Sequence, residues 1–173
     1  MNLDRVRIDV GIGDLVFGMT MAQVESIVGQ CSSRQVHEDG CVELSFVDHG
    51  IKCEFSVEWN HLLTAVGSTR ESAHFFGKGL HGKSKAEVLR MLDALDADLL
   101  RTGAPESDES IEIIETGPMV RTQHWFRDDQ HYEVWSILRF VNDKPDWPIP
   151  LEDYTPLHEE DDVVWPDELW SSH

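Results

Sequence analysis

The sequence predicts an α+β protein of two tandem repeats, each a short helix or helix pair packed on a three- to four-stranded antiparallel meander, followed by an extended proline-rich C-terminal strap. Three observations predict it: similar helix starts at Thr20 and Ser84, three strand-like runs after each, and a change of composition at Asn142. We therefore expect the first repeat over residues 1–78, the second over 79–141 and the strap over 142–173.

The first repeat is expected to start its helix at a capping box. The hydroxyl of Thr20 accepts a hydrogen bond from a backbone N–H of the first turn, while the side chain of Gln23 reaches back to the N–H of Thr20. Gly29 is placed to end the helix in the left-handed conformation. The apolar stripe of this helix consists of Met21, Val24, Ile27 and Val28.

Two alternating runs, CVELSF and IKCEFSVEW, and a third shorter run, LLTAVGSTR, follow the first helix. We expect a two-residue hairpin loop at His49-Gly50. The expected cross-strand pairs are Val42 with Val57, Leu44 with Phe55, and Phe46 with Cys53. All of these residues then share one face of the sheet, and Cys53 is predicted to be a core residue.

The second repeat is expected to follow the same plan. Ser84 and Glu87 form its capping box, and SIEIIE, MVRTQHWF and HYEVWSILRFV are its three strands. A single half of this size with a one-sided sheet is only marginally stable. We therefore expect the two halves either to share one continuous sheet or to pack through their helical layers.

The segment VRIDVGIGDLVFGMTMAQVESIVG resembles the small domain of the beta-lactamase inhibitory proteins and of the outer-membrane assembly lipoproteins. The resemblance covers residues 15–29 and, more loosely, residues 82–95. It implies a helix layer on an antiparallel meander, in tandem, and a surface presented to an enzyme. Those relatives are exported and the inhibitor's repeats carry disulfides, whereas this chain shows neither a signal peptide nor a suitable cysteine pair. No functional residue is carried over, because the shared motif serves capping and packing.

Strong acidity limits the partners. Thirty-three acidic and fourteen basic residues give a net charge of -19, which repels nucleic acids and anionic lipid headgroups and attracts a basic partner. Acidity that serves only solubility is the simpler alternative. Because no apolar window is long enough to span a membrane and no secretory signal is evident, we expect a cytoplasmic protein without nucleic-acid or membrane binding.

No chemical motif stands out. The nine histidines are scattered without metal-binding spacing, and no GxSxG or Cys–His arrangement occurs. The stretch GKGLHGKS resembles the end of a P-loop, but the capping role of Ser84 explains its serine without a nucleotide. Three cysteines without CxxC spacing favour free thiols. We therefore predict no catalytic residue, no cofactor and no metal.

The last 32 residues are acidic, rich in proline and rich in aromatic residues. Prolines exclude a long helix or central strand, and aromatic side chains commonly anchor interfaces. Trp147, Ile149 and Leu151 are expected to dock the strap on the protein's own sheet. The candidate partner-binding residues are Tyr154, Glu159, Glu160, Asp161, Asp162, Trp165, Asp167, Glu168 and Trp170.

These features predict a non-enzymatic binding protein. Acidic, single-unit chains with an FGMT start resemble bacterial immunity proteins, antitoxins that neutralise polymorphic toxins delivered between competing cells. We therefore expect a cytosolic immunity protein that occludes the active site of a cognate secreted toxin domain with a basic surface. The alternatives are a small-molecule-binding or scaffold domain without catalysis and, third, an enzyme.

Overall fold

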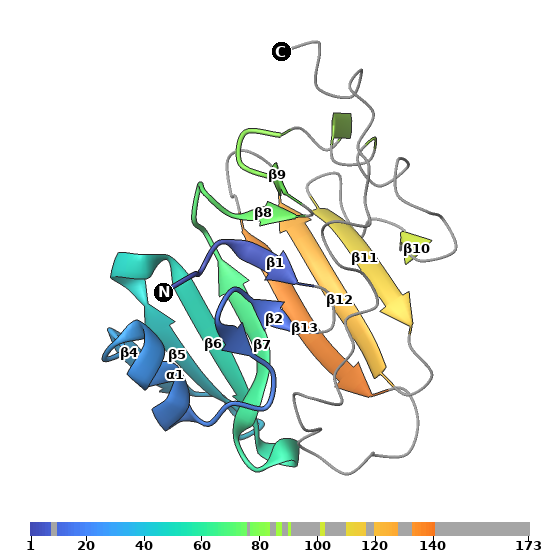
Figure 1. Cartoon of the computed structure of the whole chain (residues 1–173). Helices are drawn as coiled ribbons and strands as arrows, with labels where there is room; N and C mark the ends of the chain where they lie inside the picture. Colours follow the sequence, from blue (N-terminus) through green and yellow to red (C-terminus); the bar gives the residue numbers. More distant parts are fainter. Residues whose placement is uncertain are drawn as a thin grey trace.

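The computed structural model in Figure 1 describes residues 1–7, 10–75, 77–83, 86–87, 90, 101–102, 110–116, 120–127 and 133–140. These residues combine two β-sheets with helical segments, so the α+β class is as predicted. The residues of the C-terminal strap, 142–173, lie outside the described residues.

The larger sheet has eight strands in the order β10-β11-β12-β13-β7-β6-β5-β4, each antiparallel to its neighbours. In chain order the strands are β4 (Ser33–Val36), β5 (Val42–Phe46), β6 (Ile51–Ser56), β7 (Leu62–Ser68), β10 (Arg101–Thr102), β11 (Ser110–Thr116), β12 (Val120–Arg127) and β13 (Val134–Phe140). The strands of the two halves meet where β13 pairs with β7. Of the two ways in which the halves were expected to join, the described strands show the continuous sheet.

A second sheet, which the sequence did not predict, has the order β3-β2-β1-β8-β9. Its strands are β1 (Arg5–Arg7), β2 (Gly11–Ile12), β3 (Leu15–Val16), β8 (His74–Phe75) and β9 (Lys78–Gly79). Figure 1 shows β1 and β2 lying with α1 (Met21–Val28) on one face of the larger sheet. The fully buried side chains between these layers include Ile12, Leu15, Val24, Leu44, Phe46, Phe55 and Leu63.

Asp4 and Arg70 tie the start of β1 to the end of β7. The Arg70 guanidinium donates from Nε to Oδ1 of Asp4 at 2.6 Å and from Nη1 to the carbonyl oxygen of His49 at 3.0 Å. The hydroxyl of Ser72 donates to the same Asp4 oxygen at 2.5 Å. Hydrogen bonds from Arg70 and Ser72 stabilise the carboxylate and hold the pKa of Asp4 below its usual value.

The capping box of α1 is confirmed. The N–H of Gln23 donates to Oγ1 of Thr20 at 3.2 Å, and the N–H of Thr20 donates to Oε1 of Gln23 at 2.8 Å. Val24 and Val28 face the core. The helix ends at Gly29 with φ 105° and ψ -174°, a glycine-favoured conformation that is more extended than the left-handed one expected.

The β5–β6 hairpin corrects the predicted register. The observed pairs are Val42 with Phe55, Leu44 with Cys53, and Phe46 with Ile51. The loop contains residues 47–50, a 3₁₀ turn over Val47–His49 followed by Gly50 with φ 62°, and therefore two residues more than expected. Because the shift is even, the buried face is unchanged. Val57, expected on that face, instead lies in a second 3₁₀ turn and is 43% exposed.

The core role of Cys53 is confirmed, since its side chain is fully buried. Burial raises the pKa of the Cys53 thiol far above its usual value. Cys31, Cys41 and Cys53 are all free.

The second helix start lies mostly outside the described residues. Residues 86, 87 and 90 are helical, whereas Ser84 and residues 91–100 are among those that the structure does not describe. No described helix is both long enough and apolar enough to cross a membrane.

Candidate functional site

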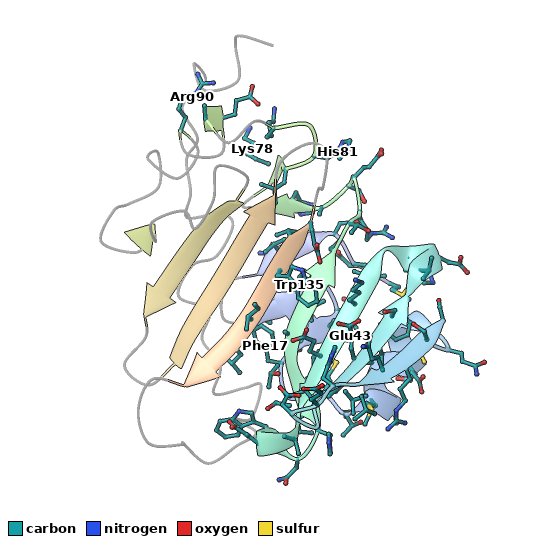
Figure 2. All side chains as sticks on the ribbon, turned by 180° about the vertical axis from the view of Figure 1, so that it is seen from behind. Phe17, Glu43, Lys78, His81, Arg90 and Trp135 are labelled. Carbon is teal, nitrogen blue, oxygen red and sulfur yellow. The ribbon has the colours of Figure 1, made fainter. Side chains whose placement is uncertain are left out.

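The candidate site is the face of the larger sheet opposite α1, here called the outer face. Side chains alternate along β5 and β6, so that Glu43, Ser45, Lys52 and Glu54 are more exposed than their buried neighbours. Figure 2 views the molecule from behind and shows Glu43 and Trp135 on this side. The register places Glu43 opposite Glu54 and Ser45 opposite Lys52.

Three side chains gather on this face, one from just after β4 and one each from β5 and β6: His37, Glu43 and Glu54, here called the His–Glu cluster. The Nε2 atom of His37 lies 3.7 Å from Oε2 of Glu43, and one ligand atom from each of the three residues lies within 4.8 Å of the others. The side chain of Glu43 is only 17% exposed. Glu43 is a partly desolvated carboxylate beside a second carboxylate, that of Glu54, so a nearby positive charge would stabilise its ionised form.

The backbone brings His37 to this place. It follows the last residue of β4, and its N–H donates to the carbonyl oxygen of Cys41 at 2.9 Å. Gln35 of β4 is the residue directly opposite Glu43, and His37 lies two positions further along the chain, one residue past the end of β4. Residues two positions apart on an extended chain share a face, which places the imidazole diagonally across from Glu43.

A tryptophan lies on the outer face at the junction of the two halves. Trp135 of β13 is the cross-strand partner of Gly67 on β7. A Cβ atom at Gly67 would lie 2.4 Å from Cε2 of Trp135, so the indole ring covers the glycine and occupies the space of a side chain. The ring is half-buried, and its Nε1–H donates a hydrogen bond to Oε1 of Glu133.

A hollow of about 160 Å³ lies beside the β5–β6 turn. Its lining includes Lys52, Gly67 and Glu133, together with Val47 and Gly50 of the turn. Small-molecule sites usually enclose about 300–1,000 Å³. The hollow is therefore better matched to one side chain of a bound protein than to a cofactor.

The candidate residues predicted from the sequence and those found in the structure do not overlap. Tyr154, Glu159–Asp162, Trp165, Asp167, Glu168 and Trp170 all lie outside the described residues. Sequence reasoning missed the His–Glu cluster and Trp135. The polar residues that alternate with the apolar ones in VELSF and IKCEF indicate an exposed face of the sheet. Only the strand register shows which of these polar residues lie next to one another.

Comparison of the chain with models of protein families, with curated proteins and with solved structures found no match.

Proposed function

We propose that this protein is a cytosolic immunity protein that binds a cognate secreted toxin domain and occludes its active site. The observation that carries the proposal is the outer face, where a half-buried Trp135 and the carboxylates of Glu43 and Glu54 lie on one antiparallel sheet. Aromatic residues of this kind are common anchors of protein interfaces. Acidic groups on a chain of net charge -19 would speed its encounter with a basic partner.

The mechanism is steric blockade assisted by charge. The carboxylates would stand in for an anionic substrate, while Trp135 would supply contact area at little cost in side-chain entropy. The acidic residues 159–162 and the tryptophans of the C-terminal strap would extend the same surface chemistry. Neither catalysis nor a nucleic-acid or membrane partner belongs to the proposed mechanism.

We further propose that the two halves are tandem repeats. The strand order supports it, because β4-β5-β6-β7 is followed across the sheet by β13-β12-β11-β10. This is the order expected when two copies of a four-strand unit are related by a twofold axis between their last strands. The two capping-box sequences at Thr20 and Ser84 support the same relation.

The test uses the C-terminal domain of a secreted protein encoded directly upstream of this chain's gene. The domain should form a one-to-one complex with the protein and lose its activity. Trp135→Ala and Glu43→Gln should each weaken binding by about tenfold or more, whereas Glu71→Gln, an exposed residue in the β7–β8 connection, should not.

The C-terminal residues are tested separately. Deleting residues 156–173 should weaken inhibition and lower the salt sensitivity of association, because the deletion removes six acidic residues. A toxin domain that stays active in a molar excess of the protein contradicts the proposed function. Full affinity in both the truncated chain and the two outer-face variants contradicts the proposed surface.

A further inference from the structure

We infer that the His–Glu cluster is a zinc site with an open coordination position. The cluster includes the two carboxylates of the proposed toxin-binding surface, but the test of this inference needs no toxin domain. The inference concerns His37, Glu43 and Glu54, which approach one another on three neighbouring strands or strand ends.

The chemistry of the three groups fits zinc. One imidazole nitrogen and two carboxylate oxygens are ordinary zinc ligands, and three protein ligands plus water is the usual composition of a zinc site that remains open. Hard cations such as Mg²⁺ and Ca²⁺ favour sites made only of oxygen. The imidazole of His37 therefore favours a transition metal.

The spacing also fits zinc. Zinc–ligand bonds of about 2.0–2.2 Å in a tetrahedron place the ligand atoms roughly 3.3–3.6 Å apart. The Nε2 atom of His37 and Oε2 of Glu43 are 3.7 Å apart, and the ligand atoms of the three residues all lie within 4.8 Å of one another. Small rotations of the two glutamate side chains would close the remaining difference without moving the strands.

The strand register favours a bound cation in the cluster, because it places two carboxylates side by side. Glu43 and Glu54 are direct cross-strand partners, and like charges at such positions destabilise a sheet. The Glu43 side chain is mostly buried, which strengthens the repulsion because less water screens it. A divalent ion between the carboxylates would turn this repulsion into attraction.

The turn between β4 and β5 holds the backbone of His37 in place before any metal binds. The N–H of Gly40 donates to the carbonyl oxygen of His37 at 2.9 Å, and the N–H of Cys41 donates to Oδ1 of Asp39 at 2.9 Å. A ligand fixed by its turn loses little freedom on binding. The fourth position of the zinc ion would then be filled by water or by a side chain of a bound protein.

The experiment titrates the full-length, tag-free chain with Zn²⁺ alone by calorimetry and repeats the titration with Co²⁺, whose visible spectrum reports tetrahedral coordination. One ion should bind per chain, and Zn²⁺ should raise the melting temperature. His37→Ala and the double variant Glu43→Gln/Glu54→Gln should each weaken binding by about tenfold or more.

A second His–Glu pair provides the matched control. His81 and Glu71 approach to 3.8 Å, so His81→Ala and Glu71→Gln remove the same chemical groups elsewhere. These variants should keep the affinity for Zn²⁺. Unchanged Zn²⁺ affinity in the cluster variants, or no binding at about 100-fold molar excess of Zn²⁺, would overturn the inference.

Discussion

At the scale of single residues, Gly67 and Trp135 define the centre of the outer face. Residue 67 must be a glycine in this geometry, because the indole ring fills the space where a Cβ atom would stand. A strand glycine normally weakens a sheet, and an aromatic ring over it restores part of the lost packing. The close fit makes this position sensitive to a single methyl group.

Gly67→Ala should therefore lower the free energy of unfolding by about 1–3 kcal/mol, because the methyl group would push the ring out of place. Gly79→Ala is the matched control, since no atom of the described residues lies within 4 Å of its Cβ position and its φ is not positive. Urea unfolding of both variants measures the difference. In a Trp135→Ala background the effect of Gly67→Ala should largely vanish, and an equal loss in both backgrounds would contradict the contact.

The role of a residue could be predicted from the sequence where it depends only on neighbours along the chain. Cys53 was correctly predicted as a core residue because alternation alone fixes its face. Glu43 and Glu54 were not recognised as neighbours, because this requires a register that depends on loop length. The role of His37 depends in addition on where β4 ends.

At the scale of elements, α1 was predicted well because its signals lie within a few residues of one another. Its capping box and the burial of Val24 and Val28 agree with the sequence. The β5–β6 hairpin was predicted with the right face and the wrong register. A glycine at position 50 fits the end of a four-residue loop as well as it fits a two-residue loop, and alternation cannot distinguish shifts of two.

The capping box gives a prediction for α1. Thr20→Ala should lower the free energy of unfolding by about 1 kcal/mol, because the N–H of Gln23 loses its acceptor at the helix start. Thr20→Ser keeps the hydroxyl and is the control, for which a change of only a few tenths of a kcal/mol is expected. Chemical denaturation measures both, and equal losses in the two variants would mean that the methyl group rather than the hydroxyl matters.

The link between Asp4 and Arg70 gives a pH-dependent prediction for β1. The folded-state pKa of Asp4 lies below its ordinary value of 3.8, so its contribution to stability is present above that pH and is lost as pH falls through the folded-state pKa. Asp4→Asn should therefore lower the free energy of unfolding at pH 7 by about 0.5–1 kcal/mol, a range reduced for solvent screening of this partly exposed pair.

The measurement compares the parent chain and Asp4→Asn across pH. The difference between them should shrink below about pH 4, as the Asp4 carboxylate of the parent chain becomes protonated. High salt should also reduce the difference at pH 7. A difference that is constant from pH 7 to acid would show that the charge of Asp4 contributes nothing.

At the scale of the whole molecule, the decisive contacts join residues far apart in the sequence. The β13–β7 pairing joins the strands of both halves in one sheet. The parallel β1–β8 pairing joins β1, β2 and β3 to β8 and β9 in the smaller sheet. Neither of these strand pairings could be predicted from periodicity. The alternation of apolar and polar residues indicates a strand and its buried face, but it does not identify the neighbouring strand. The sequence could only limit the halves to a shared sheet or packed helical layers.

Ser136 tests whether the two halves unfold as one body. It lies on β13 opposite Val66 of β7 and is fully buried, and within the described part of the chain its hydroxyl has no hydrogen-bond partner. Ser68, on the adjacent strand, is almost as buried, but its Oγ accepts a hydrogen bond from the N–H of Arg70 at 3.2 Å. The same substitution should therefore have opposite signs at these two positions.

Ser136→Ala should raise the free energy of unfolding by about 1 kcal/mol by removing an unsatisfied buried group, and Ser68→Ala should lower it by about the same amount. Amide hydrogen exchange can follow β6 in one half and β12 in the other. If the shared sheet opens only by global unfolding, Ser136→Ala should slow exchange in both strands by the same factor, roughly fivefold for 1 kcal/mol. Slower exchange in β12 alone would mean that the halves open independently, and the β7–β13 junction would then not unite them into one cooperative unit.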